Sequence, residues 1–171
     1  MAGKALAAAA AAALTVFVAP ATAADSGKWS VTGSGWGSGV VAGDHVELAA
    51  HSDAGGANPS GHGEVQTQPP YMPTNDGGEV VCVRVAGNRA VVVWRLREPQ
   101  TTPDNPGFVG EFGAAYIEDN GPPVGGRPVD RMLDFSLRSS TAALFCNTDL
   151  GFSFAFLATP IESGNFVVNN N

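Results

Sequence analysis

The chain has 171 residues, of which 16 are acidic and 9 are Lys or Arg, so its formal net charge is -7. Nucleic acid and anionic lipid are poor partners for such an acidic surface. With 22 Gly, 12 Pro and 15% charged residues, the composition is typical of short strands joined by many turns. It favours one all-β domain and implies no cofactor.

The N-terminus has the pattern of a secretory signal peptide. Lys4 precedes an apolar run from Ala5 to Ala19, and Ala21-Thr22-Ala23 places small residues before a cleavage site. The run is too short for a membrane-spanning helix, and no later segment approaches 18 apolar residues. We therefore expect residues 1–23 to be removed and residues 24–171 to form a single secreted β domain.

Cys82 and Cys146 are the two cysteines of the chain. In an oxidising compartment an even number of cysteines is most simply explained by a disulfide. Neither cysteine stands in a CxxC spacing or beside clustered histidines, which argues against a reactive or metal-bound pair. The sequence predicts a structural disulfide, worth on the order of 4 kcal/mol in the chain-entropy model.

The clearest strand signal is a hairpin over residues 80–97 that turns at Gly87-Asn88. Counting outward from the turn places Val83 opposite Val92, and Val81 opposite Trp94. The face expected in the core carries Val81, Val83, Val85, Ala90, Val92 and Trp94. The other face, which can meet water, carries Cys82, Arg84, Val91, Val93, Arg95 and Arg97. The disulfide would then hold the C-terminal segment against the outside of the sheet.

A second hairpin is predicted from Phe108 to Glu118, returning from Asp130 to Arg138. In the returning strand Leu133, Phe135 and Leu137 form the core face, opposite Asp134, Ser136 and Arg138. Glycines at every second position of residues 33–39 indicate a bend, a bulge or the close approach of another backbone. Further strands are expected at residues 44–51, 62–68, 150–158 and 165–169. The fold expected is an antiparallel meander of roughly eight or nine strands, closed as an up-and-down barrel or a barrel-like sandwich.

Three long loops fall at one end of such a meander: Pro69 to Gly78, Glu98 to Gly107 and Ser139 to Asp149. Tyr71 and Met72, flanked by prolines, are the candidate ligand contacts of this rim. The alternative is that these two side chains anchor the loop to its own barrel.

Several short motifs carry a family resemblance. They are Gly33-Ser34-Gly35-Trp36, Val80-Val81-Cys82 ahead of Gly87-Asn88-Arg89-Ala90, Glu118-Asp119-Asn120-Gly121 with Pro128-Val129-Asp130, and Gly164-Asn165-Phe166. In these motifs the chain resembles a family of small secreted bacterial β-domains common in actinomycetes, most of them without an assigned activity. The resemblance implies a fold, and it carries over no catalytic residue.

Motifs that would indicate chemistry are few. No GxSxG elbow or HExxH pattern occurs in the sequence. A zinc site built from His45, His51 and His62 is conceivable, although isolated surface histidines are far commoner. The residues Glu118, Asp119, Asn120 and Asp130 either bind calcium or supply a tight turn, and the turn is the favoured interpretation.

These observations favour a non-enzymatic binding module whose partner is an unknown extracellular ligand or envelope component. A purely structural envelope protein is the alternative. A secreted hydrolase would require paired carboxylates, such as Glu64 and Glu111, to converge in a cleft. A monomer with no catalytic residue, metal or cofactor is expected.

Overall fold

The computed structural model describes residues 27–37, 43–67, 74–102 and 105–170. Its elements are β1 (Lys28–Gly37), β2 (Asp44–Asp53), the 3-10 helix η1 (Ala54–Gly56), β3 (Ser60–Thr67), β4 (Thr74–Asn75), β5 (Gly78–Ala86), β6 (Arg89–Thr102), β7 (Asn105–Glu118), β8 (Arg131–Leu137), α1 (Ser139–Asn147), the 3-10 helix η2 (Asp149–Leu157) and β9 (Thr159–Asn170). None of the helices in these ranges is long and apolar enough to cross a membrane.

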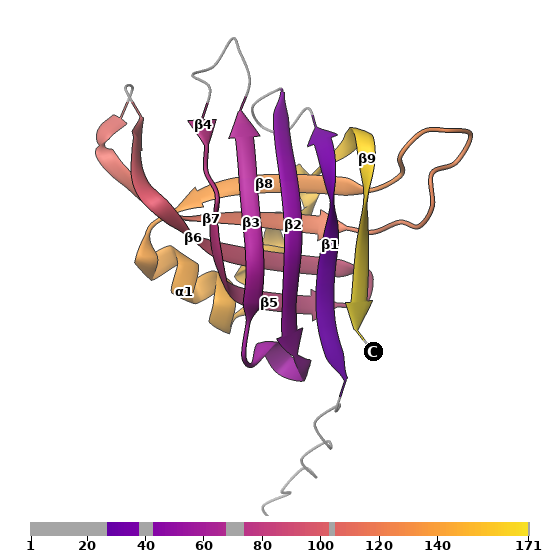
Figure 1. The fold of residues 1–171 in the computed structure, drawn as a ribbon, viewed down its shortest axis with the longest axis horizontal. Coiled ribbons are helices and arrows are strands. Elements are labelled where there is room, and N and C mark those ends of the chain that lie inside the picture. Colours follow the sequence, from indigo (N-terminus) through magenta and orange to yellow (C-terminus); the bar gives the residue numbers. More distant parts are fainter. Residues whose placement is uncertain (1–26, 38–42, 68–73, 103–104, 171) are drawn as a thin grey trace, which may run out of the picture.

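The strands form one antiparallel meander that closes into a ring. Apart from β4, each strand pairs with the next along the chain, the short β4 pairs with β3, and β9 returns to pair with β1. This confirms the predicted all-β meander. The ring is barrel-like but irregular, because β8 and β9 share only the pairs Arg131↔Pro160 and Met132↔Thr159. Figure 1 shows β1, β2, β3 and β9 crossing in front of β5 to β8.

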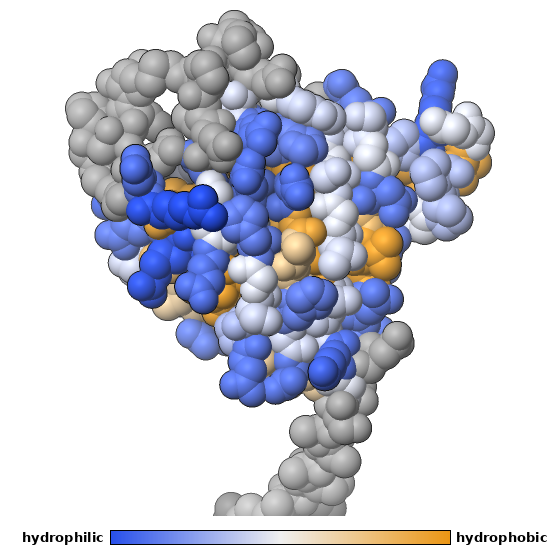
Figure 2. All heavy atoms as spheres, viewed as in Figure 1, coloured by the Kyte–Doolittle hydropathy of each residue, from blue (hydrophilic) through white to orange (hydrophobic). Residues whose placement is uncertain are grey.

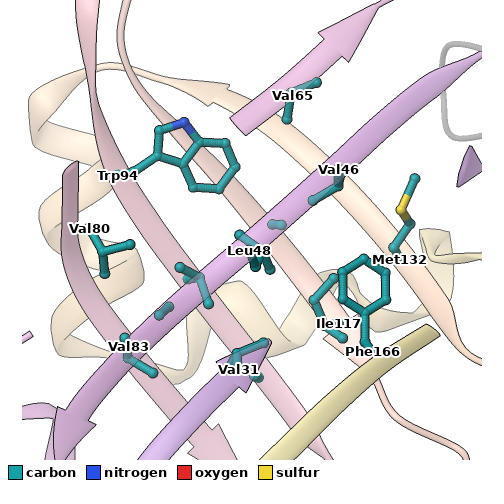
Figure 3. Packing of buried hydrophobic residues seen from close by; sticks show 14 of the residues in the cluster. Val31, Val46, Leu48, Val65, Val80, Val83, Trp94, Ile117, Met132 and Phe166 are labelled. Atoms are coloured by element: carbon teal, nitrogen blue, oxygen red, sulfur yellow. The ribbon is translucent and has the colours of Figure 1, made fainter. Parts of the chain in front are cut away.

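Apolar side chains from both halves of the ring fill its interior. The buried cluster contains Val31, Val46, Leu48, Ala50, Val65, Val80, Val83, Ala90, Val92, Trp94, Leu96, Ala115, Ile117, Met132, Ile161 and Phe166. Figure 3 shows ten of these side chains labelled, converging from several strands. Burial on this scale is the main source of stability for such a sheet.

The glycines of β1 allow the chain to pass close to β9. Gly33 has φ 131°, and a Cβ built there would overlap the carbonyl oxygen of Asn165. A Cβ at Gly35 would lie 2.9 Å from Cε2 of Phe166. Of the bend, bulge or close approach that the glycine spacing indicated, the structure shows the close approach, and it is what lets the ring close between β1 and β9.

A second apolar cluster lies outside the barrel, under α1 and η2. It combines Cys82, Val91, Val93, Ala114, Tyr116, Leu133 and Leu137 from the strands with Ala142, Phe145 and Ala158. On β5 and β6 this face was predicted to meet water, which is wrong for Val91 and Val93 because the helices cover it. The opposite outer face, over β1 to β3, is largely hydrophilic (Figure 2).

Two segments differ from the predicted elements. Residues 139–149 were expected to be a loop, but α1 forms there because Ala142 and Phe145, three apart, bury one helical face. Residues 150–158 were expected to be a core strand, but all of them except Ala158 belong to η2. Phe152 and Phe154 pack on the outer cluster, whereas Phe156 is 76% exposed.

The central hairpin follows the predicted register from Ala86↔Arg89 as far as Cys82↔Val93. A bulge then shifts the pairing, so Trp94 lies opposite Val80 rather than Val81. Val81 consequently packs with the outer cluster. The predicted loop from Glu98 to Gly107 is also wrong over most of its length, since β6 runs to Thr102 and β7 begins at Asn105.

Candidate functional site

Two carboxylates point into the barrel near one of its ends. Asp44 begins β2 and pairs with Gly37 of β1 and Thr67 of β3, on the same face as the core residue Val46. Asp134 of β8 lies opposite Ala115 of β7, which belongs to the interior cluster. Directly paired residues project to the same side of a sheet, so both carboxylates face inward.

Asp44 is buried, and its carboxylate lacks part of the hydrogen bonding that would offset the cost of burial. Its side chain is 2% exposed, and within the described residues its Oδ1 has no hydrogen-bond partner. Burial raises the pKa of this carboxyl, and a hydrogen bond from Thr67 opposes the rise. Asp44 therefore offers an unsatisfied acceptor to the interior.

Asp134 is half-buried and has the larger pKa shift. Its pKa is raised to about 7, mainly by burial and to a lesser degree by the carboxylates of Asp44 and Asp76. Asp76 lies just ahead of β5, so three acidic residues from separate parts of the chain influence one another at this end. Near neutral pH Asp134 is therefore present in both its protonated and its ionised form.

Trp94 forms the apolar boundary of this acidic group. The ring is fully buried, and its Nε1 donates a hydrogen bond to the backbone oxygen of Asp76 at 2.9 Å. A Cβ at Gly63 would lie 2.6 Å from Cδ2 of the ring, and one at Gly113 would also overlap it. Glycines on β3 and β7 thus make room for the indole inside the barrel.

The acidic group lies at the end where β1 ends, β2 begins and β3 ends. The predicted rim was placed at the same end of the meander. The predicted ligand contacts Tyr71 and Met72 lie outside the residues whose side chains the structure describes. Sequence reasoning missed Asp44 and Asp134, although the position of Asp44 two residues before Val46 was an available signal.

The three histidines considered for a zinc site lie in different environments and do not form one group. The ring of His45 stacks on Trp36 with centroids 4.7 Å apart. His62 lies 3.4 Å from Oε2 of Glu64, and His51 is exposed. Within the described ranges, no group of three or more His, Cys, Asp or Glu side chains could hold a metal ion.

The carboxylates considered for calcium accept backbone N–H groups. Asp130 is fully buried, and its two oxygens accept from the nitrogens of Asn120 at 2.9 Å and Phe166 at 2.8 Å. Asp119 accepts from Gly121 at 2.9 Å and Val168 at 3.0 Å. These bonds fasten the loop between β7 and β8 to β9, which favours the turn interpretation.

Glu118, the remaining acidic residue of this group, pairs with Arg131 at 3.4 Å. The two carboxylates that a hydrolase site was expected to require, those of Glu64 and Glu111, also have different hydrogen-bond partners. Glu64 accepts a hydrogen bond from Gln66 at 2.6 Å, and Glu111 accepts one from the nitrogen of Ser139 at 3.2 Å.

Cys82 and Cys146 are both free, so the predicted disulfide is not present in this structure. A disulfide needs its two sulfur atoms about 2.05 Å apart, a distance that sequence spacing cannot guarantee. The two thiols nevertheless influence each other. Hydrogen bonding between them raises the pKa of Cys82 and lowers the pKa of Cys146, which nearby Arg84 also lowers.

Arg84 supplies the attachment that the disulfide was expected to provide. Its guanidinium donates to the carbonyl oxygen of Cys146 at 3.1 Å and to Oδ1 of Asp149 at 2.7 Å. The helical segment is therefore held against β5 as expected, by hydrogen bonds, one ion pair and apolar contact.

The fold and the interior carboxylates define an antiparallel sheet closed into a barrel-like ring with an acidic end. Comparison with protein-family models, curated proteins and solved structures finds no match. The site must therefore be interpreted from its own geometry.

Proposed function

We propose that this protein is an extracellular binding protein that holds a small molecule at the acidic end of its barrel. The observation that carries the proposal is the buried Oδ1 of Asp44, which lacks a hydrogen-bond partner within the described residues. An unsatisfied buried polar group destabilises a protein by about 1–3 kcal/mol, so each one calls for an explanation. A ligand that donates a hydrogen bond to this oxygen supplies one.

The composition of the interior favours binding over a purely structural role. Most of the barrel is filled with side chains such as Val31, Leu48 and Ile117, as stability alone would require. Inward-facing carboxylates at Asp44 and Asp134 oppose stability, because buried charges are costly. They are better explained as part of a site.

The extracellular location rests on the sequence pattern. Residues 1–23 have the features of a secretory leader, and they lie outside the described residues. The resemblance to small secreted bacterial β-domains agrees with this location. The proposed working form is residues 24–171, which is large enough to bury a full core.

Trp94 provides the test of this proposal. The substitutions Trp29→Phe and Trp36→Phe together leave Trp94 as the single tryptophan, beside Asp76. A fragment library is then screened for saturable changes in its fluorescence. Support would be a fragment whose binding is weakened by Asp44→Asn and unaffected by Glu47→Gln, an exposed position on the same strand. The proposal would be refuted if no fragment binds, or if every fragment that binds is unaffected by Asp44→Asn.

A further inference from the structure

We propose that the molecule bound at this end carries a positively charged nitrogen, as a protonated amine or an amidinium, seated between Asp44 and Asp134. This inference rests on the proposed function and names the chemical class of its ligand. The two side chains come from β2 and β8 and project inward at the acidic end of the barrel.

Two carboxylates of the described residues raise the pKa of Asp134 through their charge: Asp44 on β2 and Asp76 ahead of β5. Like charges in a poorly solvated interior repel one another, and burial penalises each of them separately. A cation relieves the repulsion and the burial penalty together. A neutral donor relieves less, and an anion increases the repulsion.

Hydrogen-bonding capacity points to the same class of ligand. Oδ1 of Asp44 is an acceptor with no partner within the described residues. An ammonium group offers three donors and an amidinium offers a planar fork, so either can bridge two carboxylates. Hydrogen bonds between ionised partners are roughly twice as strong as neutral ones.

The residues next to the carboxylates are apolar. Val46 follows Asp44 by two positions on the inner face of β2, and Met132 precedes Asp134 by two on that of β8. Figure 3 shows both side chains in the interior cluster together with Trp94. The part of the ligand behind its charged nitrogen should accordingly be an alkyl or aryl group.

A metal ion is the competing occupant for carboxylate oxygens. Calcium normally takes six to eight oxygen ligands. The described residues contain no group of three or more side chains that could hold a metal. An organic cation needs only the two carboxylates, so we favour it and keep calcium as an outcome of the test.

The test uses benzylamine, benzamidine, benzyl alcohol and calcium chloride as probes, with calorimetry on the purified protein at low salt and pH 8. We expect the two cations to bind at least ten times more tightly than the alcohol. Asp44→Asn and Asp134→Asn should each weaken benzylamine binding about tenfold, while Glu47→Gln, on the outer face, should leave it unchanged. At pH 5, where Asp134 keeps its proton, benzylamine should bind more weakly.

The comparison of benzylamine with benzyl alcohol requires no variant, so it decides the question even if a substitution impairs folding. Equal affinity of the two would overturn the cationic class and leave a small-molecule site standing. Tighter binding of calcium, lost in the same variants, would replace the organic cation with a metal. Failure of all probes, together with an empty Trp94 screen, would refute the proposed function itself.

Discussion

The indole ring of Trp94 occupies the space beside Gly63, where a Cβ would lie 2.6 Å from Cδ2 of the ring. This contact joins β6 to β3 through the interior and orients the ring so that Nε1 reaches the backbone oxygen of Asp76. The hydrogen bond between Trp94 and the backbone at Asp76 therefore depends on a residue without a side chain. The relationship links the packing of the barrel to its proposed site.

A double-mutant cycle measures this contact. Gly63→Ala should destabilise the protein by about 1–3 kcal/mol, because the new methyl group overpacks the ring. Trp94→Phe should also destabilise it, since it removes volume and the hydrogen bond to Asp76. Combined, the two should cost at least about 0.5 kcal/mol less than their sum, as measured by urea unfolding. Strict additivity would show that the two residues do not touch.

The stability of the protein should fall as the pH rises from about 4 to about 7. In the unfolded chain Asp134 loses its proton near the usual value of 3.8, whereas in the folded protein its pKa is about 7. Between these values the folded state holds a proton that the unfolded state has lost, so raising the pH favours unfolding. Asp134→Asn should flatten this part of a melting-temperature profile. An equally steep profile in the variant would assign the effect to other groups.

The two thiols should differ in reactivity when the protein is reduced. Cys146 is half-buried and its pKa is lowered, while Cys82 is 6% exposed and its pKa is raised. Because the thiolate is the nucleophile, iodoacetamide at pH 7 should modify Cys146 at least about ten times faster than Cys82. Peptide mass spectrometry gives both rates, and the urea-unfolded protein is the control in which they should converge. Faster modification of Cys82 would contradict the described contact.

Asp130 should be among the most important polar residues for stability. Asp130→Ala leaves the buried nitrogen of Phe166 and the partly buried nitrogen of Asn120 without their acceptor, and the expected loss is roughly 2–5 kcal/mol. Asp149→Ala is the matched control, because that carboxylate is 84% exposed and its ion pair with Arg84 contributes about 1 kcal/mol or less. Similar losses from both substitutions in chemical unfolding would be inconsistent with the structure.

The sequence predicted the hairpin at Gly87-Asn88 because a short turn determines the pairing next to it. The prediction was correct as far as Cys82↔Val93 and wrong at Trp94, where a bulge adds one residue to β5. A bulge is set by packing against other strands, and nothing in the local pattern marks it. The burial of Trp94 was nevertheless predicted correctly, because Trp94 kept its place in the alternation of β6.

The candidate site was harder to predict, because β8 is covered on both faces. Leu133 and Leu137 are buried as expected, but under the helices outside the barrel rather than inside it. The opposite face, which carries Asp134, was therefore interpreted as solvent-exposed. The helices themselves went unpredicted, since the alternating Phe152 and Phe154 imitate a strand. Both faces of β8 are covered, one by the barrel interior and the other by the helices. Which of the two faces points into the interior depends on how the whole chain closes the ring.

The central claim is that an ionisable pair of carboxylates inside the barrel forms a binding site. Carbon-detected NMR of the aspartate carboxyl groups, titrated with pH and assigned with Asp134→Asn, tests it most directly. The account predicts a pKa of about 7 for Asp134 in the free protein and a clear decrease when benzylamine saturates the site. An Asp134 carboxyl that titrates near 4, unaffected by the amine, would contradict it.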